Sequence, residues 1–378
     1  MKIIYIANTR LPTEMAHGLQ VMKMCDAFSR HGGELELVVP RRFGISDLIK
    51  KDPFEYYRVE KNFKIKRIFC FDLTPLNRFL GPISFLTQAL SFAFFSSIYL
   101  IFKKSDIIYS RDRFSLFFTS LIKRNIVLEV HQLHRSLFAF LLKRVKKIIV
   151  ITQGLRQSLI NKGVREEKIL VAPDGIDLKD FEVKKSKEEC RKDLGLPLNK
   201  KIILYTGHLY KWKGVETLAL SSGFLDPSAL VVVVGGIKWY LSDFKKFVEK
   251  NNLEKVLVLG HKDYSQIPFY LKAADCLVLT GTQNYETSKS FTSPMKMFEY
   301  MTSGRPIVAS DLPSFRETLK ENNAILVKPD DPQMMAIGIQ KALNDFVLAK
   351  NISEQAYNNV QNYTWDNRAK KILEFINN

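Results

Sequence analysis

The sequence contains few cysteines and lacks the short motifs of the commonest nucleotide-binding sites. Its 378 residues include four cysteines, which are far apart and form no C-x-x-C pair: Cys25, Cys70, Cys190 and Cys276. This spacing favours reduced thiols in the core of a cytoplasmic protein over a disulfide framework or a zinc site. Neither G-x-G-x-x-G after the first expected strand nor G-x-x-x-x-G-K-[ST] occurs. A dinucleotide site therefore has little support, and P-loop phosphoryl transfer is excluded.

Acidic residues are scarce in the first part of the chain. Residues 1–150 hold 25 lysines and arginines against 12 aspartates and glutamates, whereas the whole chain has a formal charge of +18. The same 150 residues contain 17 of the 27 phenylalanines. Basic and aromatic residues together indicate a polyanionic partner, either an anionic membrane face or nucleic acid, although an inert solvated surface has the same composition. No homeodomain, zinc-finger or RNA-recognition signature is present, so nucleic acid is not expected as a partner.

Charge is absent altogether from residues 79–102, FLGPISFLTQALSFAFFSSIYLIF. The length is compatible with a membrane-spanning helix. However, the stretch contains Pro82, Gln88 and several serines, and it leads directly into an expected strand at 106–112. These features favour a helix that packs on the sheet or touches a membrane over one that crosses it. The N-terminus, MKIIYIANTR, lacks the apolar run of a signal peptide and is predicted to enter the fold as a strand.

The first half alternates between strand and helix patterns. Residues 2–7 predict a strand, residues 19–32 predict a helix that ends at Gly32-Gly33, and ELELVVP predicts the next strand. This order is typical of a βαβ unit with a parallel sheet. Further strands are expected at 106–112, 126–132 and 147–154, and a further helix at 155–163.

The second half repeats this alternation after a charged stretch. Residues 183–200, predicted as a short helix plus linker, separate an N-terminal domain, 1–182, from a C-terminal domain, 201–362. The last helix, 363–378, is expected to pack back on the first domain. Two α/β, Rossmann-like, doubly wound domains that face each other across a cleft are therefore predicted, with ligands outside the carboxyl ends of the strands.

One carboxylate stands in an apolar stretch, SFTSPMKMFEYMTSGRPIVASDLPSF (290–315). A helix is expected to begin near Pro294, with Thr292 or Ser293 as its N-cap and free N–H groups that form an anion site. Glu299 then lies about one and a half turns inside the helix, where it could accept two hydrogen bonds from the vicinal diol of a ribose. The alternative is an exposed glutamate on a surface helix.

The same stretch, from SPMKMFEY to SFRE, resembles the signature of the family-four retaining glycosyltransferases, which have the GT-B fold. LYTGHLYKWKGVETL resembles the family's Gly-x-x-x-x-Lys-Gly segment, VLVLGHKDYSQIPFYLKAADCLVL its nucleobase-side segment, and KILVAPDGIDLKDF the end of its first domain. AHGLQVMKMCDAF resembles its N-terminal loop, and LEVHQ carries a histidine where the family has one. The resemblance extends over almost the whole chain.

The resemblance implies specific roles. Glu299 would hold the donor ribose, Lys213 the diphosphate, and His131 would lie near the reacting sugar; these three are the candidate catalytic residues. Gly18 would approach the phosphates, and Arg111 is a weaker candidate for acceptor contact or for a surface salt bridge. His17 and His134 receive no role. The remaining candidate donor-binding residues are Gly207, His208, Lys211, Gly260, His261, Phe291, Thr292, Ser293 and Met295.

Two positions depart from the family pattern. The family usually carries a second glutamate eight residues before the one matching Glu299, but Phe291 stands there. The family also often has arginine after the glycine matching Gly207, where this chain has His208. Lys211 could supply that charge. The first departure leaves the identity of the sugar open.

The expected activity is transfer of a sugar from a nucleotide-diphosphate sugar to a glycan or lipid-linked acceptor, with retention of configuration. No Asp-x-Asp and no cluster with metal-ligand spacing occurs, so no metal or other cofactor is expected. A sugar-nucleotide epimerase is less well supported. An inactive nucleotide-sugar-binding or membrane-scaffold protein is the other alternative.

A basic patch next to residues 79–102 is predicted to face an anionic membrane. The protein is accordingly expected in the cytoplasm, with peripheral attachment to the inner face of the membrane as one possibility. The residues predicted for this patch are Lys61, Lys64, Lys66, Arg67 and Arg78.

Overall fold

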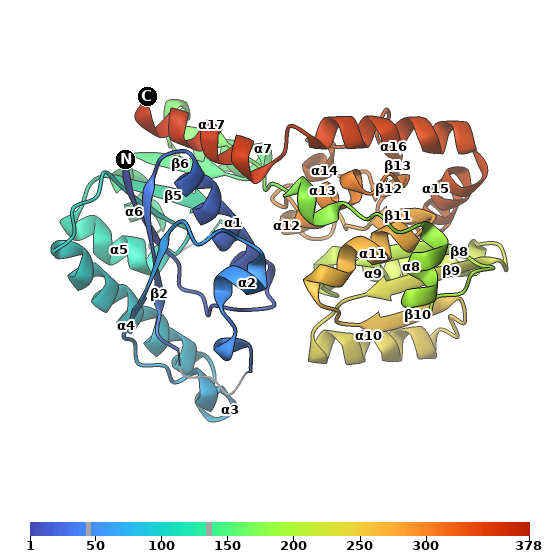
Figure 1. Ribbon diagram of the computed structural model, residues 1–378, viewed down its shortest axis with the longest axis horizontal. Helices are drawn as coiled ribbons and strands as arrows, with labels where there is room; N and C mark the ends of the chain where they lie inside the picture. The colour runs from blue at the N-terminus through green and yellow to red at the C-terminus, as the bar shows by residue number, and fades with distance from the viewer. Residues whose placement is uncertain (43–46, 134–137) are drawn as a thin grey trace. The chain divides into compact units, whose positions relative to one another are not determined.

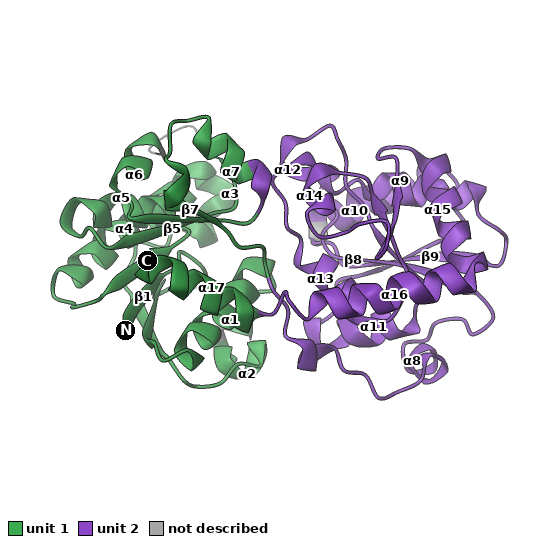
Figure 2. Cartoon of the chain, turned by 90° about the horizontal axis from the view of Figure 1, so that it is seen from above, with its two compact units in different colours: residues 1–151, 155–174, 365–378 green, residues 152–154, 175–364 purple. Residues whose placement is uncertain are grey.

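The computed structural model describes residues 1–42, 47–133 and 138–378. The chain divides into two compact units, shown in Figure 2. Unit 1 comprises residues 1–151, 155–174 and 365–378, and unit 2 comprises residues 152–154 and 175–364. The boundary between the two units thus follows Asp174, whereas the sequence predicted the end of the first domain at residue 182.

Unit 1 is built around a parallel sheet of seven strands in the order β3-β2-β1-β4-β5-β6-β7 (Figure 1). The strands are β1 (Lys2–Ile6), β2 (Glu34–Pro40), β3 (Lys64–Ile68), β4 (Ile107–Ser110), β5 (Ile126–Val130), β6 (Lys147–Val150) and β7 (Ile169–Val171). The α-helices are α1 (Ala16–Arg30), α2 (Pro53–Tyr57), α3 (Asn77–Leu80), α4 (Pro82–Ile101), α5 (Arg113–Ile122), α6 (Phe138–Arg144), α7 (Gln153–Ile160) and α17 (Trp365–Asn377).

Unit 2 contains a parallel sheet of six strands in the order β10-β9-β8-β11-β12-β13. The strands are β8 (Lys201–Thr206), β9 (Ala229–Val234), β10 (Val256–Gly260), β11 (Cys276–Leu279), β12 (Ile307–Ser310) and β13 (Ile325–Val327). The α-helices are α8 (Lys187–Asp193), α9 (Val215–Ser221), α10 (Lys238–Lys250), α11 (Ile267–Ala273), α12 (Glu286–Lys289), α13 (Met295–Thr302), α14 (Pro313–Arg316), α15 (Pro332–Asn344) and α16 (Phe346–Val360).

Alternate strand residues of unit 2 pack into two cores, one on each face of the sheet. Leu204 and Leu277 belong to one core, whereas Ile203 and Val278 belong to the other. Burial on both faces explains why these strands are almost continuously apolar. In each sheet the strand order reverses direction, between β1 and β4 and between β8 and β11, so ligand sites are expected at the carboxyl ends of these strands. The predicted pair of doubly wound α/β domains is confirmed.

The charged stretch at 183–200 contains helix α8, whose start is closed by a capping box. Ser186 accepts a hydrogen bond from the N–H of Glu189, and the Glu189 side chain accepts one from the N–H of Ser186. The four cysteines are buried and unpaired, as expected for reduced core thiols. The C-terminal helix α17 contacts α1 and belongs to unit 1.

The apolar stretch at 79–102 forms α3 and α4. Within the described residues, α4 (Pro82–Ile101) is the one helix long and apolar enough to cross a membrane, and less than half of it is buried. It contacts α5 and strand β3. Because its buried side packs on unit 1, the prediction of a helix packed on the sheet is confirmed.

Candidate functional site

The first part of the site follows β8, the strand at the turning point of the unit 2 sheet. Gly207 has φ of +120°, and its N–H donates to the carbonyl of Val234. A Cβ at this position would lie 3.1 Å from Nζ of Lys296, so glycine leaves room for that ammonium. Burial, together with Lys296 and Lys213, lowers the pKa of His208 to about 4, and its buried Nδ1 has no hydrogen-bond partner among the described residues.

Lys213 ends the short 3-10 helix Lys211–Lys213, directly before Gly214 and helix α9. Its Nζ lies 3.9 Å from the ring centroid of Trp212, and no hydrogen bond or ion pair to it is found in the part of the chain that the structure describes. Burial lowers the pKa of Lys213 to about 7. An ammonium that is desolvated and lacks a counter-ion is suited to bind an anion.

Helix α13 carries Glu299, which is buried with 6% of its surface exposed. The helix is anchored because Met297, Phe298 and Met301 enter the core and because the N–H of Thr206, at the end of β8, donates to the Tyr300 hydroxyl over 2.8 Å. Packing therefore holds Glu299 on a helix that is anchored to the end of β8, and the alternative of an exposed surface glutamate is wrong.

One oxygen of Glu299 accepts a 3.2 Å hydrogen bond from the Tyr264 hydroxyl. Burial raises the pKa of Glu299 to about 7, against the lowering effects of this hydrogen bond and of Lys296. The structure gives no partner for the second carboxylate oxygen within the described residues, so this oxygen remains available for a ligand hydroxyl.

Lys296, one helical turn before Glu299, is a further residue of the site that was not predicted from sequence. Its Nζ donates to the carbonyl of Thr206 over 2.7 Å and lies 3.6 Å from the ring centroid of Tyr205. Burial and then Lys213 lower its pKa well below the usual value, whereas Glu299 raises it. Lys296 thus interacts electrostatically with both predicted donor-binding residues, and it joins them into one site. Its spacing of three residues from Glu299 was the available signal, because such residues share a helix face.

The start of α13 differs from the prediction. The helix begins at Met295, and the N-cap position is occupied by Pro294, which makes no side-chain cap. Thr292 and Ser293 precede the cap and are buried, and the hydroxyl of Ser293 is without a partner among the described residues. Proline holds an extended φ/ψ here, so it replaces the predicted Thr or Ser cap while leaving backbone N–H groups for an anion.

The remaining predicted donor residues surround this region of unit 2. Gly260 ends β10 with φ of +73°, and its carbonyl accepts from the N–H of Gly235. Lys211 and His261 are exposed, whereas Phe291 and Met295 are partly buried before and at the start of α13. Their roles stay predictions.

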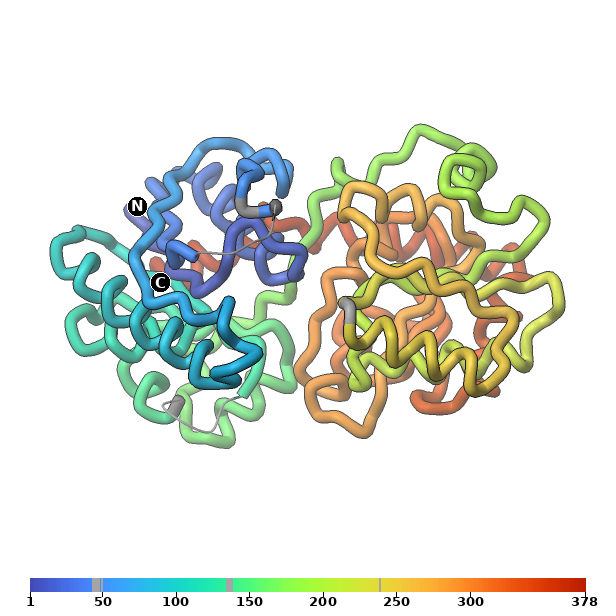
Figure 3. The backbone as a smooth tube through the Cα atoms, turned by 90° about the horizontal axis from the view of Figure 1, so that it is seen from below, coloured from blue at the N-terminus to red at the C-terminus, as the bar shows by residue number. Residues whose placement is uncertain are grey.

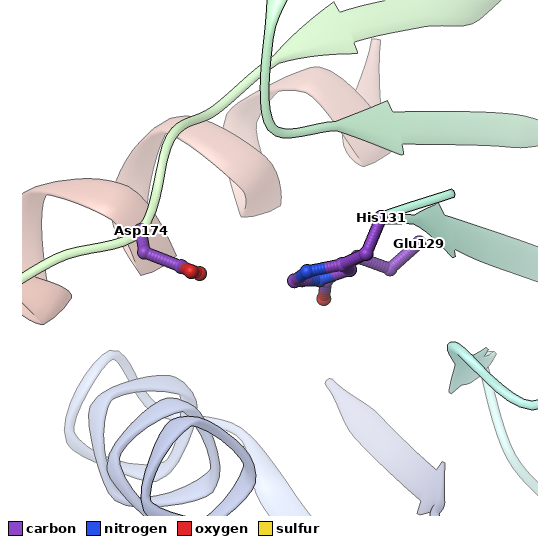
Figure 4. Close-up of side chains that lie close together, drawn as sticks. All are labelled: Glu129, His131 and Asp174. Atoms are coloured by element: carbon purple, nitrogen blue, oxygen red, sulfur yellow. The ribbon is translucent and has the colours of Figure 1, made fainter. Parts of the chain in front are cut away.

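The second cluster lies in unit 1 around Glu129 and His131, at the end of β5 (Figure 4). Glu129 is fully buried, and its oxygens accept hydrogen bonds from His131 at 2.6 Å, from Arg368 at 2.9 Å, from Gln20 at 2.6 Å and from the Tyr109 hydroxyl. Burial alone would raise the pKa of Glu129, but Arg368, His131 and Arg111 hold it well below the usual value. Glu129 is therefore a buried anion.

His131 is held by this anion in one tautomer. Burial and then Arg111 lower the pKa of His131, so the imidazole is neutral near pH 7. Because the Glu129 carboxylate can only accept, Nε2 carries the proton and Nδ1 keeps a free lone pair. Figure 4 shows the carboxylate of Asp174 pointing toward this imidazole. Burial raises the pKa of Asp174, and its buried Oδ1 lacks a hydrogen-bond partner in the described part of the chain.

The ligand atoms of Glu129, His131 and Asp174 lie within 4.8 Å of one another, a spacing that could hold a metal ion. However, the oxygens of Glu129 already accept four hydrogen bonds, and the guanidinium of Arg368 lies beside one of them. A cation would have to displace these donors and sit next to Arg368. The cluster is better explained as an ion-pair network that positions His131.

Two further predicted residues of unit 1 have local partners. Gly18 lies in the first turn of α1 rather than in a loop, its N–H donates to the carbonyl of Met15, and a Cβ there would meet the Tyr57 hydroxyl at 2.3 Å. Packing against Tyr57 is thus sufficient to require glycine. Arg111 donates to Gln20 over 2.9 Å and, with Glu129 and His131, lines a cavity of about 180 Å³. His17 contacts the Thr9 hydroxyl, and His134 lies outside the described residues.

The predicted basic patch is divided in the structure. Lys61 pairs with Asp52 at 2.9 Å, while Lys66 lies over the Tyr99 ring of α4 and Arg78 is exposed on α3. Along β3, Lys64 and Lys66 are two residues apart and point to the same face of the sheet. Arg67 is the next residue, so it points to the opposite face. The five residues therefore do not share one surface.

The depressed pKa of Lys213 predicts a pH-dependent gain in stability when the charge is removed. In the folded state its pKa is about 7 rather than 10.5, so the destabilisation is full below pH 7 and fades as pH rises toward 10.5. Lys213→Met should raise the Tm of the unit 2 transition by a few degrees at pH 6, at about 2–4 °C per kcal/mol for a unit of this size. The gain should shrink by pH 9 in calorimetry. Lys211→Met, at an exposed site, is the matched control, and a lower Tm for Lys213→Met at pH 6 would contradict the assignment.

Comparison of this sequence with models of known protein families identifies its family. The model of the family "Glycosyl transferases group 1" matches residues 186–359, and that of "Glycosyltransferase Family 4" matches residues 18–180. The two matches extend over most of both units. The chain belongs to the group 1 glycosyltransferases.

Curated relatives of this chain are distant. It is 28% identical over 237 residues to an uncharacterized glycosyltransferase of Methanocaldococcus jannaschii, covering 60% of this chain and 58% of the relative. It is 29% identical over 194 residues to a putative teichuronic acid biosynthesis glycosyltransferase of Bacillus subtilis, covering 50% and 46%. The matches thus span about half the length of these relatives.

Solved structures show that this chain has the GT-B fold. Anabaena HepE in complex with UDP and glucose superposes with a TM-score of 0.77 at 18% identity, over 100% of this chain and 99% of that one. Sucrose-phosphate synthase from Thermosynechococcus elongatus gives 0.78 at 18% identity, over 100% and 98%. The predicted family and fold are confirmed.

Proposed function

We propose that this protein transfers a hexosyl group from a nucleotide-diphosphate sugar to a glycan or lipid-linked acceptor, with retention and without a metal. The observation that carries the proposal is the cluster of Lys213, Lys296 and Glu299 at the carboxyl ends of β8 and the neighbouring strands. Two buried lysine amines, whose protonation an anion favours, suit a diphosphate, and a buried carboxyl group with a spare oxygen suits a diol. The complex of Anabaena HepE with UDP and glucose supports a donor of this class.

Lys296 fills the role left open by His208. Burial and the two lysines keep His208 neutral, so it does not replace the arginine frequent in the family. Lys296 lies beside Gly207 instead. With Lys213 it places two buried amines near the leaving diphosphate, whose negative charge favours their protonated, cationic forms. In the proposed front-face reaction, the bond between the sugar C1 and the diphosphate breaks, the acceptor oxygen bonds to C1 on the same face, and the acceptor proton passes to the leaving phosphate. Charge on the diphosphate is the developing charge that preorganised cations stabilise.

Unit 1 is proposed to serve the sugar and acceptor through the small cavity at Arg111, Glu129 and His131. The neutral His131, with Nδ1 unprotonated, can accept a hydrogen bond from a sugar hydroxyl. Buried reduced thiols support the cytoplasmic location expected from sequence.

The test is donor binding by the folded chain and its loss in Glu299→Gln. A thermal-shift series with UDP-, GDP- and ADP-sugars should raise the Tm with one nucleotide class, since ligand binding stabilises the native state by mass action. Glu299→Gln should weaken that binding about 10- to 100-fold in calorimetry, the equivalent of about 1.5–3 kcal/mol for a charged hydrogen bond.

Glu216→Gln, on the exposed face of α9, is the control and should bind normally. No shift with any nucleotide sugar would contradict the proposal. Donor binding without any sugar transfer or nucleotide release would instead identify an inactive binding protein. Interconversion of the free donor sugar without transfer would identify an epimerase.

A further inference from the structure

Helix α4 is apolar on the side where a surface helix is normally polar. Most of its exposed residues form one apolar stripe with spacings of three or four, and Phe85 is exposed next to it. The residues of the stripe are Ile83, Leu86, Leu90, Phe94, Ile98 and Ile101. Its buried side instead includes Ser84, Gln88, Ser96 and Ser97. A helix that faces water shows the reverse distribution. The exposed stripe therefore requires an apolar environment that the rest of unit 1 does not provide.

The stripe continues onto the neighbouring elements of unit 1. Phe79 before α4 is 83% exposed, Phe102 after it is 84% exposed, and Leu121 and Ile122 are exposed at the end of α5. Ring contacts connect Phe69, Phe95 and Phe94 with Phe118 of α5, and Phe117 of α5 with Phe140 of α6. Figure 3 shows residues 77–122, in cyan to teal, as neighbouring coils of unit 1. We call this surface the α3–α6 apolar face.

The charges in the segment that forms this face are mostly positive. Residues 69–144 contain ten lysines and arginines and four acidic residues, Asp72, Asp106, Asp112 and Glu129. Three of the four have partners within unit 1: Asp72 pairs with Arg42, Asp112 caps α5, and Glu129 pairs with Arg368. Asp106 is exposed and accepts a hydrogen bond from the N–H of Lys2. The exposed basic residues of this segment include Arg78, Lys104, Arg124 and Lys143.

We propose that the α3–α6 apolar face docks on an anionic lipid bilayer, with α4 lying in the interface and the basic residues meeting the headgroups. Apolar side chains bordered by lysine and arginine are the pattern of an interfacial anchor. A second copy of the chain is a poorer occupant, because it would bring two positive borders together. The proposal concerns a surface of unit 1, whereas Lys213 and Glu299 belong to unit 2, so it does not depend on the proposed function.

The helix lies on the bilayer rather than crossing it, because its other side is fixed to unit 1. Gln88 donates to the side chain of Asn8 over 2.9 Å, and the Ser97 and Thr119 hydroxyls lie 3.2 Å apart. Strand β4 then follows after five residues. Crossing the membrane would require these buried polar contacts and the core beneath α4 to be broken.

Vesicle sedimentation of the full chain tests the docking. Wild type should bind vesicles of phosphatidylcholine with phosphatidylglycerol and should bind pure phosphatidylcholine at least about tenfold more weakly. Phe79→Ser/Ile83→Ser/Phe94→Ser should reduce binding to the anionic vesicles by at least about tenfold. The control is Phe346→Ser/Val347→Ser, which alters two residues that are each 73% exposed in unit 2.

A charge variant provides the second arm. Arg78→Gln/Lys104→Gln/Arg124→Gln should weaken anionic-vesicle binding and reduce its salt dependence, whereas Lys245→Gln/Lys246→Gln/Lys250→Gln, on exposed α10 positions, should not. Circular dichroism and Tm confirm that each variant is folded. Absence of binding to anionic vesicles, or equal binding by the serine variant and wild type, would overturn the proposal. A lipid-free dimer that the serine variant abolishes, with vesicle binding unchanged, would assign the face to a second copy.

Discussion

Replacing Lys213 with methionine is expected to lower kcat for sugar transfer by about 10²–10³-fold, because one preorganised charge on the leaving group is typically worth about 3–4 kcal/mol in the transition state. The ammonium lies 3.9 Å from the Trp212 ring centroid and has no counter-ion among the described residues. It is thus held in place without a competing internal anion. The measurement is the release of nucleoside diphosphate from the donor that gives the largest thermal shift.

Lys211→Met separates this effect from a general loss of positive charge. Lys211 is exposed at the other end of the same 3-10 turn, so its removal should change kcat by less than about threefold, as expected for a screened surface charge. The donor Kd distinguishes ground-state from transition-state contributions. If Lys213→Met keeps kcat within twofold of wild type while remaining folded, Lys213 does not stabilise the leaving group.

Arg368→Met is expected to lower the free energy of unfolding of unit 1 by about 3–5 kcal/mol, the usual effect of removing one partner from a buried ion pair. Arg368 donates to Glu129 over 2.9 Å and to the carbonyl of Pro173 over 2.9 Å, and both ionised side chains are buried. Without the guanidinium, the Glu129 carboxylate loses its main compensating charge. Urea unfolding followed by Trp365 fluorescence, in a Trp212→Phe/Trp239→Phe background, reports on unit 1 alone.

The surface pair of Lys350 and Glu354 provides the comparison. Its atoms are 3.8 Å apart and both side chains are largely exposed, so Lys350→Met should cost at most about 1 kcal/mol. Adding Glu129→Gln to Arg368→Met removes the uncompensated charge and should recover part of the loss. A loss below about 1 kcal/mol for Arg368→Met would show that the pair does not stabilise unit 1 in the way described.

The alternation of strands and helices could be predicted because most strands are buried on both faces and are therefore apolar. Strand β3, KIKRI, was missed for the opposite reason. It lies at the edge of the sheet, and its residues other than Ile68 are exposed or partly exposed, so it resembles a charged loop in sequence. The same error led Lys64, Lys66 and Arg67 to be assigned to one patch, although neighbouring strand residues point to opposite faces.

The donor half of the site was predictable because its residues lie in short local segments. Glu299 and Lys213 each occur within a recognisable stretch, and Lys296 could have been added from its helical spacing. The partners of His131 could not be found in this way. Arg368 is 239 positions from Glu129 along the chain, and a basic residue in a C-terminal amphipathic helix normally faces water. Only the folded chain shows that it is buried against a carboxylate.

The return of α17 to unit 1 determines when each half of the molecule can mature on the ribosome. Residues 175–364 are translated before Arg368, so unit 2 can finish folding before unit 1. In unit 1, Glu129 lacks the counter-charge of Arg368 until residues 365–378 have been translated. Newly made chains can thus complete unit 2 before unit 1, the reverse of the usual N-terminal-first order of domain folding.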